Sequence, residues 1–188
     1  LLEARNPRKA KIRYDVTPGP EFRLDTVEML NDSTHLGMLI DSLASRDPYL
    51  MAGSRYCTDS LSTARNRITN SLRNRGYYFF RPDYIQYLAD SIQHPGSVML
   101  RLDLANNMPE FTSQRFRTGK VTMVVNRYRG RQRPDTIHIK PGVELVQMLP
   151  SKFRRKIVEE CVTFRPGRTF AVRNMDYTQT LLSRLGIF

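Results

Sequence analysis

The sequence predicts an α+β fold: tandem small domains of order β-α-α-β-β, each a three-stranded sheet covered on one face by two helices. Three observations carry this prediction. An amphipathic helix near residues 58–75 ends at a glycine, segments of alternating apolar and polar residues flank it, and parts of the pattern recur about 100 residues later. A helix with one apolar stripe has to bury it against another element, and a sheet is the expected partner.

The helix at 58–75 has the clearest signals. Its apolar side chains recur at steps of three and four and share one face: Leu61, Ala64, Ile68 and Leu72. We expect Thr58 or Asp59 to cap its first amides, and Gly76 to end it in a left-handed conformation. The aromatic run 77–80 follows. We expect at least two of its rings to join the core rather than form a peptide-binding patch, with the other two pointing the opposite way.

Three elements are predicted before this helix. Apolar and charged residues alternate at 12–16, which indicates a half-buried strand. A second strand at 21–30 changes phase midway, which suggests a bulge or a long twisted strand. Ser33 or Thr34 then caps a short helix whose apolar residues are Leu36, Leu39, Ile40 and Leu43, and Asp47-Pro48 ends it.

Two strands are predicted after it. The first covers about 78–91, and Pro82 favours an edge position because proline cannot donate to a ladder. His94-Pro95-Gly96 forms the turn of a hairpin. In the second strand, alternate apolar residues face inward: Val98, Leu100, Leu102 and Leu104.

The pattern then repeats. Residues 22–30 align with 116–124 at four identities in nine, and the change of phase recurs. Residues 53–56 align with 167–170, where a glycine is followed at the third position by an aromatic residue. A period of this length indicates a string of small domains rather than a solenoid.

The second copy carries an insertion of about twenty residues. Its basic stretch 127–134 is interpreted as the tip of a hairpin whose return arm holds Ile137 and Ile139. A helix at 151–162 is predicted from apolar residues at steps of four: Phe153, Ile157 and Cys161. The last helix has one apolar face and stops at Gly186; the face comprises Met175, Thr178, Leu182 and Leu185.

These elements predict a domain organisation. Residues 1–20 are a lead-in with the last strand of a truncated preceding unit, and 21–106 form a complete domain. Residues 111–188 form a second domain, with the basic insertion near 127–140, cut before its final hairpin. The first residues lack a signal-peptide pattern, so we expect an internal segment of a longer protein.

Composition narrows the function without choosing it. The net charge is +12, from 30 Lys+Arg against 18 Asp+Glu, which is compatible with nucleic acid, anionic lipid or an acidic protein partner. No apolar run reaches the length of a membrane-spanning helix. Cys57 and Cys161 are the two cysteines, and their apolar surroundings favour unpaired thiols, although one disulfide stays possible.

Nothing in the sequence indicates an enzyme. His35, His94 and His138 occur in separate contexts, without a spacing that would bring two together as metal ligands. Asp59 and Asp176 lie near helix starts, where backbone amides attract carboxylates. No phosphate-binding loop, nucleophile elbow or carboxylate pair is present. We therefore expect no catalysis, no metal and no cofactor.

The order of elements, the Arg-Gly-Tyr-Tyr-Phe-Phe stop at 75–80 and the Phe-Arg-Pro-Gly-Arg-Thr-Phe stretch at 164–170 together resemble the POTRA (polypeptide-transport-associated) domains of BamA/TamA-like surface-antigen proteins. The resemblance covers nearly the whole chain. It implies a non-enzymatic scaffold at the periplasmic face of the outer membrane. Its partners would be extended or unfolded polypeptides and periplasmic or outer-membrane proteins, with the membrane reached through a barrel domain absent from this chain.

The resemblance implies peptide binding by strand addition at a sheet edge. The resemblance places that edge on the strand after the second helix, which predicts the binding residues Tyr84, Ile85, Gln86, Tyr87, Leu88 and Ala89. A second predicted site, for docking a partner or anionic lipid, is the basic tip formed by Arg127, Arg129, Arg131 and Arg133. The alternative function is a basic adaptor or nucleic-acid-binding module, suggested by this tip and by a second arginine cluster on one helix: Arg65, Arg67, Arg73 and Arg75.

Overall fold

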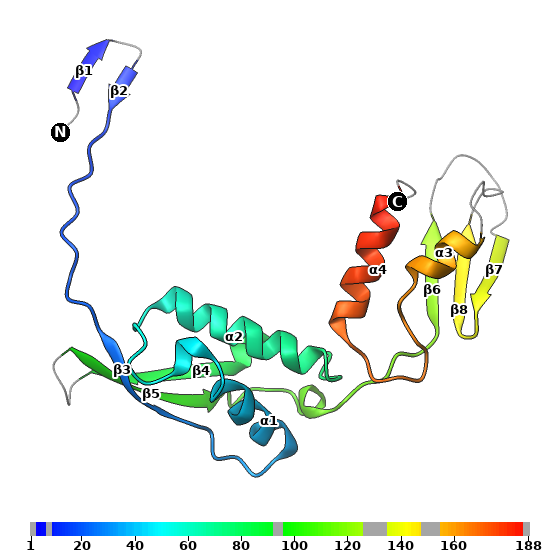
Figure 1. Ribbon diagram of the computed structural model, residues 1–188, viewed down its shortest axis with the longest axis horizontal. Coiled ribbons are helices and arrows are strands. Elements are labelled where there is room, and N and C mark those ends of the chain that lie inside the picture. The colour runs from blue at the N-terminus through cyan, green and yellow to red at the C-terminus, as the bar shows by residue number, and fades with distance from the viewer. Residues whose placement is uncertain (1–2, 7–8, 92–95, 126–134, 148–154, 186–188) are drawn as a thin grey trace.

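The structure is a computed structural model that describes residues 3–6, 9–91, 96–125, 135–147 and 155–185 (Figure 1). Two units, each with a three-stranded sheet and a pair of helices, follow one another along the chain. An antiparallel ribbon of β1 (Glu3–Asn6) and β2 (Lys9–Lys11) precedes them and is joined to the first unit by an extended segment. The α+β prediction of tandem units is therefore confirmed.

The first unit has the predicted β-α-α-β-β order. Its elements are β3 (Arg23–Glu28), α1 (His35–Ala44), α2 (Thr58–Arg73), β4 (Ile85–Asp90) and β5 (Ser97–Leu104), with short 3-10 turns at Pro48–Leu50 and Pro82–Tyr84. The sheet order is β3–β5–β4, in which β3 is parallel and β4 antiparallel to β5. The outer strands are thus β3 and β4.

The core of this unit lies between the sheet and the helices. The apolar stripe of α2 is buried as predicted, and so are Val98, Leu100 and Leu102 of β5. Leu24 of β3 joins them, and Ile40 and Ala44 of α1 are fully buried. Alternate residues of β5 face the opposite side, so the sheet has one covered and one open face.

The predicted helix caps and stops of the first unit are confirmed in part. Thr34 caps α1 by accepting a 3.0 Å hydrogen bond from the Gly37 amide, as predicted. Thr58 and Asp59 do not cap α2: the helix begins at Thr58 itself, and Cys57 in the cap position makes no side-chain cap bond. Gly76 ends α2 with φ 102°, the predicted left-handed conformation.

Two strand predictions have different outcomes. The change of phase in 21–30 is a bulge, since the pairing of β3 with β5 shifts register between Leu24 and Thr26. Residues 12–16 do not form a strand, and Tyr14 and Val16 are each 81% exposed. Alternation alone was misleading there, because a strand needs a neighbour to pair with and none lies beside this segment in the described residues.

The aromatic run 77–80 is a turn, and the strand starts later than predicted, at Ile85. Tyr77 and Phe80 are buried, while Tyr78 and Phe79 are 40% and 42% exposed to solvent. Two rings enter the core and two face away, as expected. The buried pair is three residues apart, with the Phe80 amide bonded to the Tyr77 carbonyl, because the backbone turns here instead of extending.

The second unit has its own sheet with an equivalent arrangement of strands, but its elements follow one another in a different order along the chain. Its elements are β6 (Val121–Val125), β7 (Asp135–Lys140), β8 (Val143–Gln147), α3 (Arg155–Cys161) and α4 (Val172–Arg184). The sheet order β6–β8–β7, with β6 parallel and β7 antiparallel to β8, repeats the arrangement of the first sheet. The predicted pairing of the 135–140 arm with 121–125 is wrong, because β8 lies between them.

The helices of this unit also differ from expectation. In α3 the buried residues are Val158 and Cys161, while Ile157 is 42% exposed, so the predicted step of four through Ile157 is wrong. In α4, Thr178 and Leu182 are buried as predicted, and Leu185 lies at the exposed end. Phe153 and the Gly186 stop lie outside the described residues.

The internal repeat is visible in the backbone. In each unit, three hydrogen bonds of 2.7 to 2.9 Å tie the glycine turn before the second helix to the first strand segment. They join Tyr56 to Phe22, Leu24 to Ser54 and Gly53 to Leu24 in the first unit, and Phe170 to Phe116, Thr118 to Arg168 and Gly167 to Thr118 in the second. Both glycines have positive φ, 83° and 81°. The residues aligned by sequence are thus structural equivalents.

The two units meet at the end of α2. The Phe116 amide donates to the Gly76 carbonyl at 2.8 Å, and Arg115 Nε donates to the Arg75 carbonyl at 3.0 Å. Asn74 Oδ1 accepts a 2.9 Å hydrogen bond from the Arg173 amide in the first turn of α4. Since the cap position of α4 makes no side-chain cap bond of its own, the first unit supplies one.

Aromatic rings fill the rest of this junction. Tyr78 packs edge-on against Phe170 with ring centroids 4.9 Å apart, and Phe79 packs likewise against Phe111 and Phe116 at 5.0 and 5.1 Å. These T-shaped contacts are favourable for aromatic rings. The two outward-facing rings of the aromatic run, Tyr78 and Phe79, therefore form contacts between the units.

Candidate functional site

The predicted binding strand lies at an edge of the first sheet. Ile85 to Ala89 belong to β4, the outer strand opposite β3, and Tyr84 ends the 3-10 turn that leads into it. Pro82 belongs to this turn rather than to the strand. The edge position is thus as predicted, although the proline does not cause it.

Two residues of β4 direct their backbone amides away from the sheet. The Ala105 amide donates to the Tyr84 carbonyl at 2.9 Å, and these residues are opposite each other in register, which makes them a hydrogen-bonded pair. Bonded pairs alternate along an antiparallel ladder, so Gln86 and Leu88 bond to β5 while Tyr87 and Ala89 point outward. No partner for these two amides occurs among the described residues. The outer edge of β4 can therefore accept another strand.

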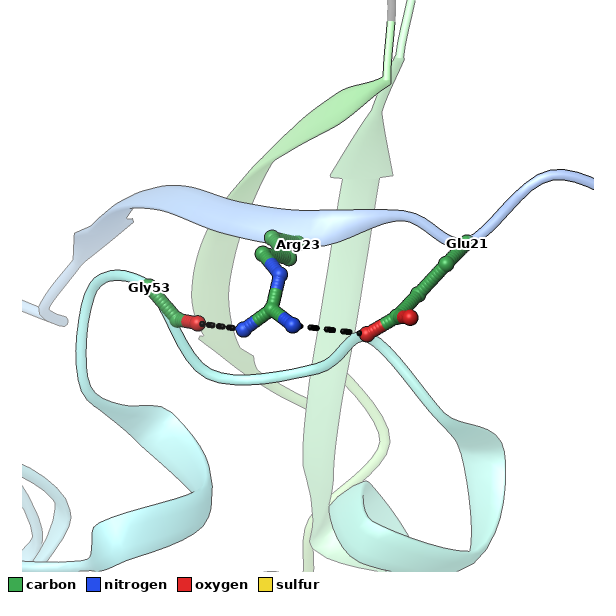
Figure 2. A network of polar contacts seen from close by, with 3 residues as sticks. All are labelled: Glu21, Arg23 and Gly53. Carbon is green, nitrogen blue, oxygen red and sulfur yellow. Dashed lines mark hydrogen bonds and ion pairs between the residues drawn. The ribbon is translucent and has the colours of Figure 1, made fainter.

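The opposite edge of the sheet is partly occupied. The glycine turn at 53–56 bonds to the start of β3 through three backbone hydrogen bonds. Figure 2 shows that the Arg23 guanidinium reinforces this contact, with one nitrogen 3.1 Å from the Gly53 carbonyl and the other 3.0 Å from Glu21 Oε1. A polypeptide strand thus meets fewer obstacles at β4 than at the start of β3.

The two faces of β4 differ in character. Ile85 is buried against the helices and Tyr87 is half-buried on the same side. Leu88 lies on the open face with 45% of its surface exposed. It borders a shallow hollow of about 340 Å³ lined by Glu28, Leu88, Ala89, Asp90, Met99 and Arg101. On the open side, an added strand would meet the exposed Leu88 side chain in a hollow that also contains charged groups.

Helix α2 borders the same edge with polar side chains. Arg65, Thr69 and Arg73 follow one another at steps of four, and the Arg65 guanidinium lies 5.1 Å from the centre of the Tyr87 ring. Four buried polar atoms of α2 and β4 have no hydrogen-bond partner in the described structure: Arg65 Nε, Thr69 Oγ1, Arg73 Nε and Tyr87 Oη. The arginine cluster is evident in the sequence, but its link to the strand is not, because the contact joins residues far apart in the chain.

Ionisation of Tyr87 is expected to destabilise the fold at high pH. Burial raises the pKa of Tyr87 to about 12 from 10.0; the nearby Arg65 charge lowers it and Asp47 raises it. Because the folded-state pKa exceeds the unfolded value, the neutral Tyr87 side chain contributes to the stability of the fold. That contribution is complete below pH 10.0 and is lost as pH rises through about 12. The test is the urea midpoint as a function of pH for the wild type and Tyr87→Phe. A variant whose stability falls as steeply as the wild type's in this window would contradict the assignment.

The histidines and cysteines form no metal site in the described part of the chain, where no group of three or more potential ligands occurs. His35 Nδ1 lies 2.8 Å from the Tyr77 hydroxyl, and His138 Nδ1 lies 3.3 Å from Glu144 Oε1. Cys57 and Cys161 are free thiols. Burial raises the pKa of the Cys161 thiol, and the neighbouring Glu160 adds to the shift.

Two further expectations concern membranes and partners. The predicted basic tip of Arg127, Arg129, Arg131 and Arg133 lies outside the described residues, as does His94. Among the helices that the structure describes, none has the length and apolar character needed to cross a bilayer.

Comparison with known proteins identifies the fold. No protein-family model and no curated protein matches the sequence. The crystal structure of POTRA domains 3 to 5 of Haemophilus influenzae BamA is similar over 89% of this chain and 52% of its own, with a TM-score of 0.51 and 11% sequence identity. POTRA domains 1 and 2 from the periplasmic domain of Anabaena Omp85 align over 88% of this chain and 79% of their own, with a TM-score of 0.42 and 13% identity. The chain spans about half the length of the BamA structure.

Proposed function

We propose that this chain, which has a POTRA-like fold, is a non-enzymatic scaffold that binds extended polypeptides by adding them as a strand to β4. The supporting observation is the pair of outward amides at Tyr87 and Ala89 on an open sheet edge. Main-chain hydrogen bonds to such an edge give affinity for many sequences, because every peptide carries the same backbone groups.

The setting we propose is the periplasmic face of the outer membrane, in the assembly or translocation of outer-membrane proteins. This part rests on the fold, which is the fold of POTRA domains from BamA, and on the family resemblance of the sequence. The partners would be polypeptide clients and periplasmic or outer-membrane proteins. The basic tip at 127–133 is a proposed docking element for such a partner or for anionic lipid.

Replacing Ala89 with proline is expected to weaken binding of a labelled, neutral peptide of alternating valine and threonine about tenfold or more, since the outward donor is lost and the ring obstructs the edge. The amide of Ala89 makes no bond to β5, so the ladder within the sheet is kept. Fluorescence anisotropy measures the affinity.

Ala89→Val is the matched control, because it keeps the amide and suits a strand. Thermal melting of both variants checks that the first unit stays folded. Equal peptide affinity of Ala89→Pro and Ala89→Val, with both folded, would rule out strand addition at β4.

A further inference from the structure

We infer that the β4 edge selects polypeptides with acidic side chains at alternate positions, and that Arg65 of α2 recognises them. This inference rests on the proposed strand addition and specifies its client. Its basis is the position of the Arg65 guanidinium over Tyr87, beside the open strand edge.

The arginines of α2 differ in whether a carboxylate lies close to the guanidinium group. Arg67 Nε lies 3.5 Å from the buried carboxylate of Asp47, and its guanidinium lies 5.9 Å from the Tyr49 ring centre. Arg65 and Arg73 have no carboxylate within ion-pair distance in the described residues, and the Nε atoms of both are buried without a hydrogen-bond partner. A buried donor without an acceptor is unfavourable, so Arg65, which lies beside β4, would gain from a ligand that accepts.

The position of Arg65 indicates which ligand atoms could reach it. Its guanidinium stacks over Tyr87, whose side chain lies on the helix side of the edge strand. In a strand added beside β4, alternate side chains would project to that same side and the others to the open face near Leu88. Carboxylates on the helix side would meet the Arg65 guanidinium, and apolar residues would cover Leu88.

Charge and chemistry favour carboxylates over other acceptors. Arginine binds a carboxylate through two parallel N–H bonds, which are stronger than bonds to a neutral amide. The chain has a net charge of +12, so an acidic segment is also attracted at longer range. A neutral strand would gain the backbone bonds alone.

The test uses three labelled peptides of equal length, with valine alternating with glutamate, glutamine or lysine. The glutamate peptide is expected to bind about tenfold more tightly than the glutamine peptide at low salt. Arg65→Gln should remove this preference. The control Arg55→Gln changes the net charge equally at an exposed arginine whose turn bridges to the opposite outer strand, β3, and should keep it.

Each outcome decides something different. Equal binding of the glutamate and glutamine peptides to the wild type, or loss of the preference in the control, would overturn the acidic selection. Strand addition itself is tested by the glutamine peptide, whose binding should fall in Ala89→Pro whatever the charges do. Arg65→Glu gives a readout that unfolding cannot mimic, because it should reverse the order and favour the lysine peptide over the glutamate peptide. If a folded Arg65→Glu variant still binds the glutamate peptide more tightly than the lysine peptide, the inference is also wrong.

Discussion

Replacing Gly76 with alanine is expected to lower the free energy of unfolding by about 2 to 4 kcal/mol and to loosen the junction between the two units. Two causes add here. Its φ of 102° is one that residues with a Cβ rarely adopt. A Cβ at this position would also lie 2.9 Å from Thr169 Cγ2 and 3.2 Å from the Phe116 carbonyl oxygen, both in the second unit.

Gly53→Ala separates these two causes. Gly53 has a similarly positive φ of 83°, but no atom lies within 4 Å of the Cβ that alanine would add. It should therefore show the conformational cost alone, about 1 to 2 kcal/mol. Urea denaturation of both variants gives the comparison, and the excess at Gly76 reports the junction. Equal losses in the two variants would show that the contacts with Thr169 and Phe116 contribute nothing.

The second large effect is expected from Phe80→Ala, which should destabilise the first unit by about 3 to 5 kcal/mol. Phe80 is 2% exposed and packs edge-on against Tyr84, whose ring centroid is 5.6 Å away. Its loss leaves a cavity under the turn from which β4 starts. The proposed binding edge should therefore become less ordered, which peptide affinity and the thermal midpoint would both report.

Phe79→Ala is the matched control one residue earlier. Phe79 is 42% exposed and contacts Phe111 and Phe116 rather than the core. It should lose about 1 to 2 kcal/mol and keep peptide binding at β4. It should also let the units move apart, which would raise the radius of gyration in small-angle X-ray scattering. If Phe79→Ala destabilises β4 as much as Phe80→Ala does, the division of the aromatic run into core and junction is wrong.

Much of the first unit could be predicted from the sequence because its signals are local. The apolar stripe of α2, the cap at Thr34 and the glycine stop at Gly76 each depend on a few neighbouring residues. The bulge in β3 was visible as a change of phase in the strand. The failure at 12–16 has the same origin, since alternation indicates what a strand would bury but not whether a partner strand is there.

The candidate site could also be predicted only in part from the sequence. The edge position of β4 followed from the order of elements, and the alternation of side chains was predictable. The stacking of Arg65 on Tyr87 and the buried Arg73 Nε without a hydrogen-bond partner were not, because they depend on how α2 lies across the sheet. In the sequence these arginines are visible only as a basic cluster on one helix, without a strand beside them.

The α+β class, the repeat and its alignment, and the helices with their buried stripes are all readable from the sequence, because periodicity, caps and glycine stops act within a few residues. Three features need the tertiary structure: β8 lies between β6 and β7, Tyr78 and Phe79 join the two units, and Asn74 caps α4. These features depend on surfaces brought together from distant parts of the chain. Which strands pair and which side chains make contact depend on the packing of the whole molecule.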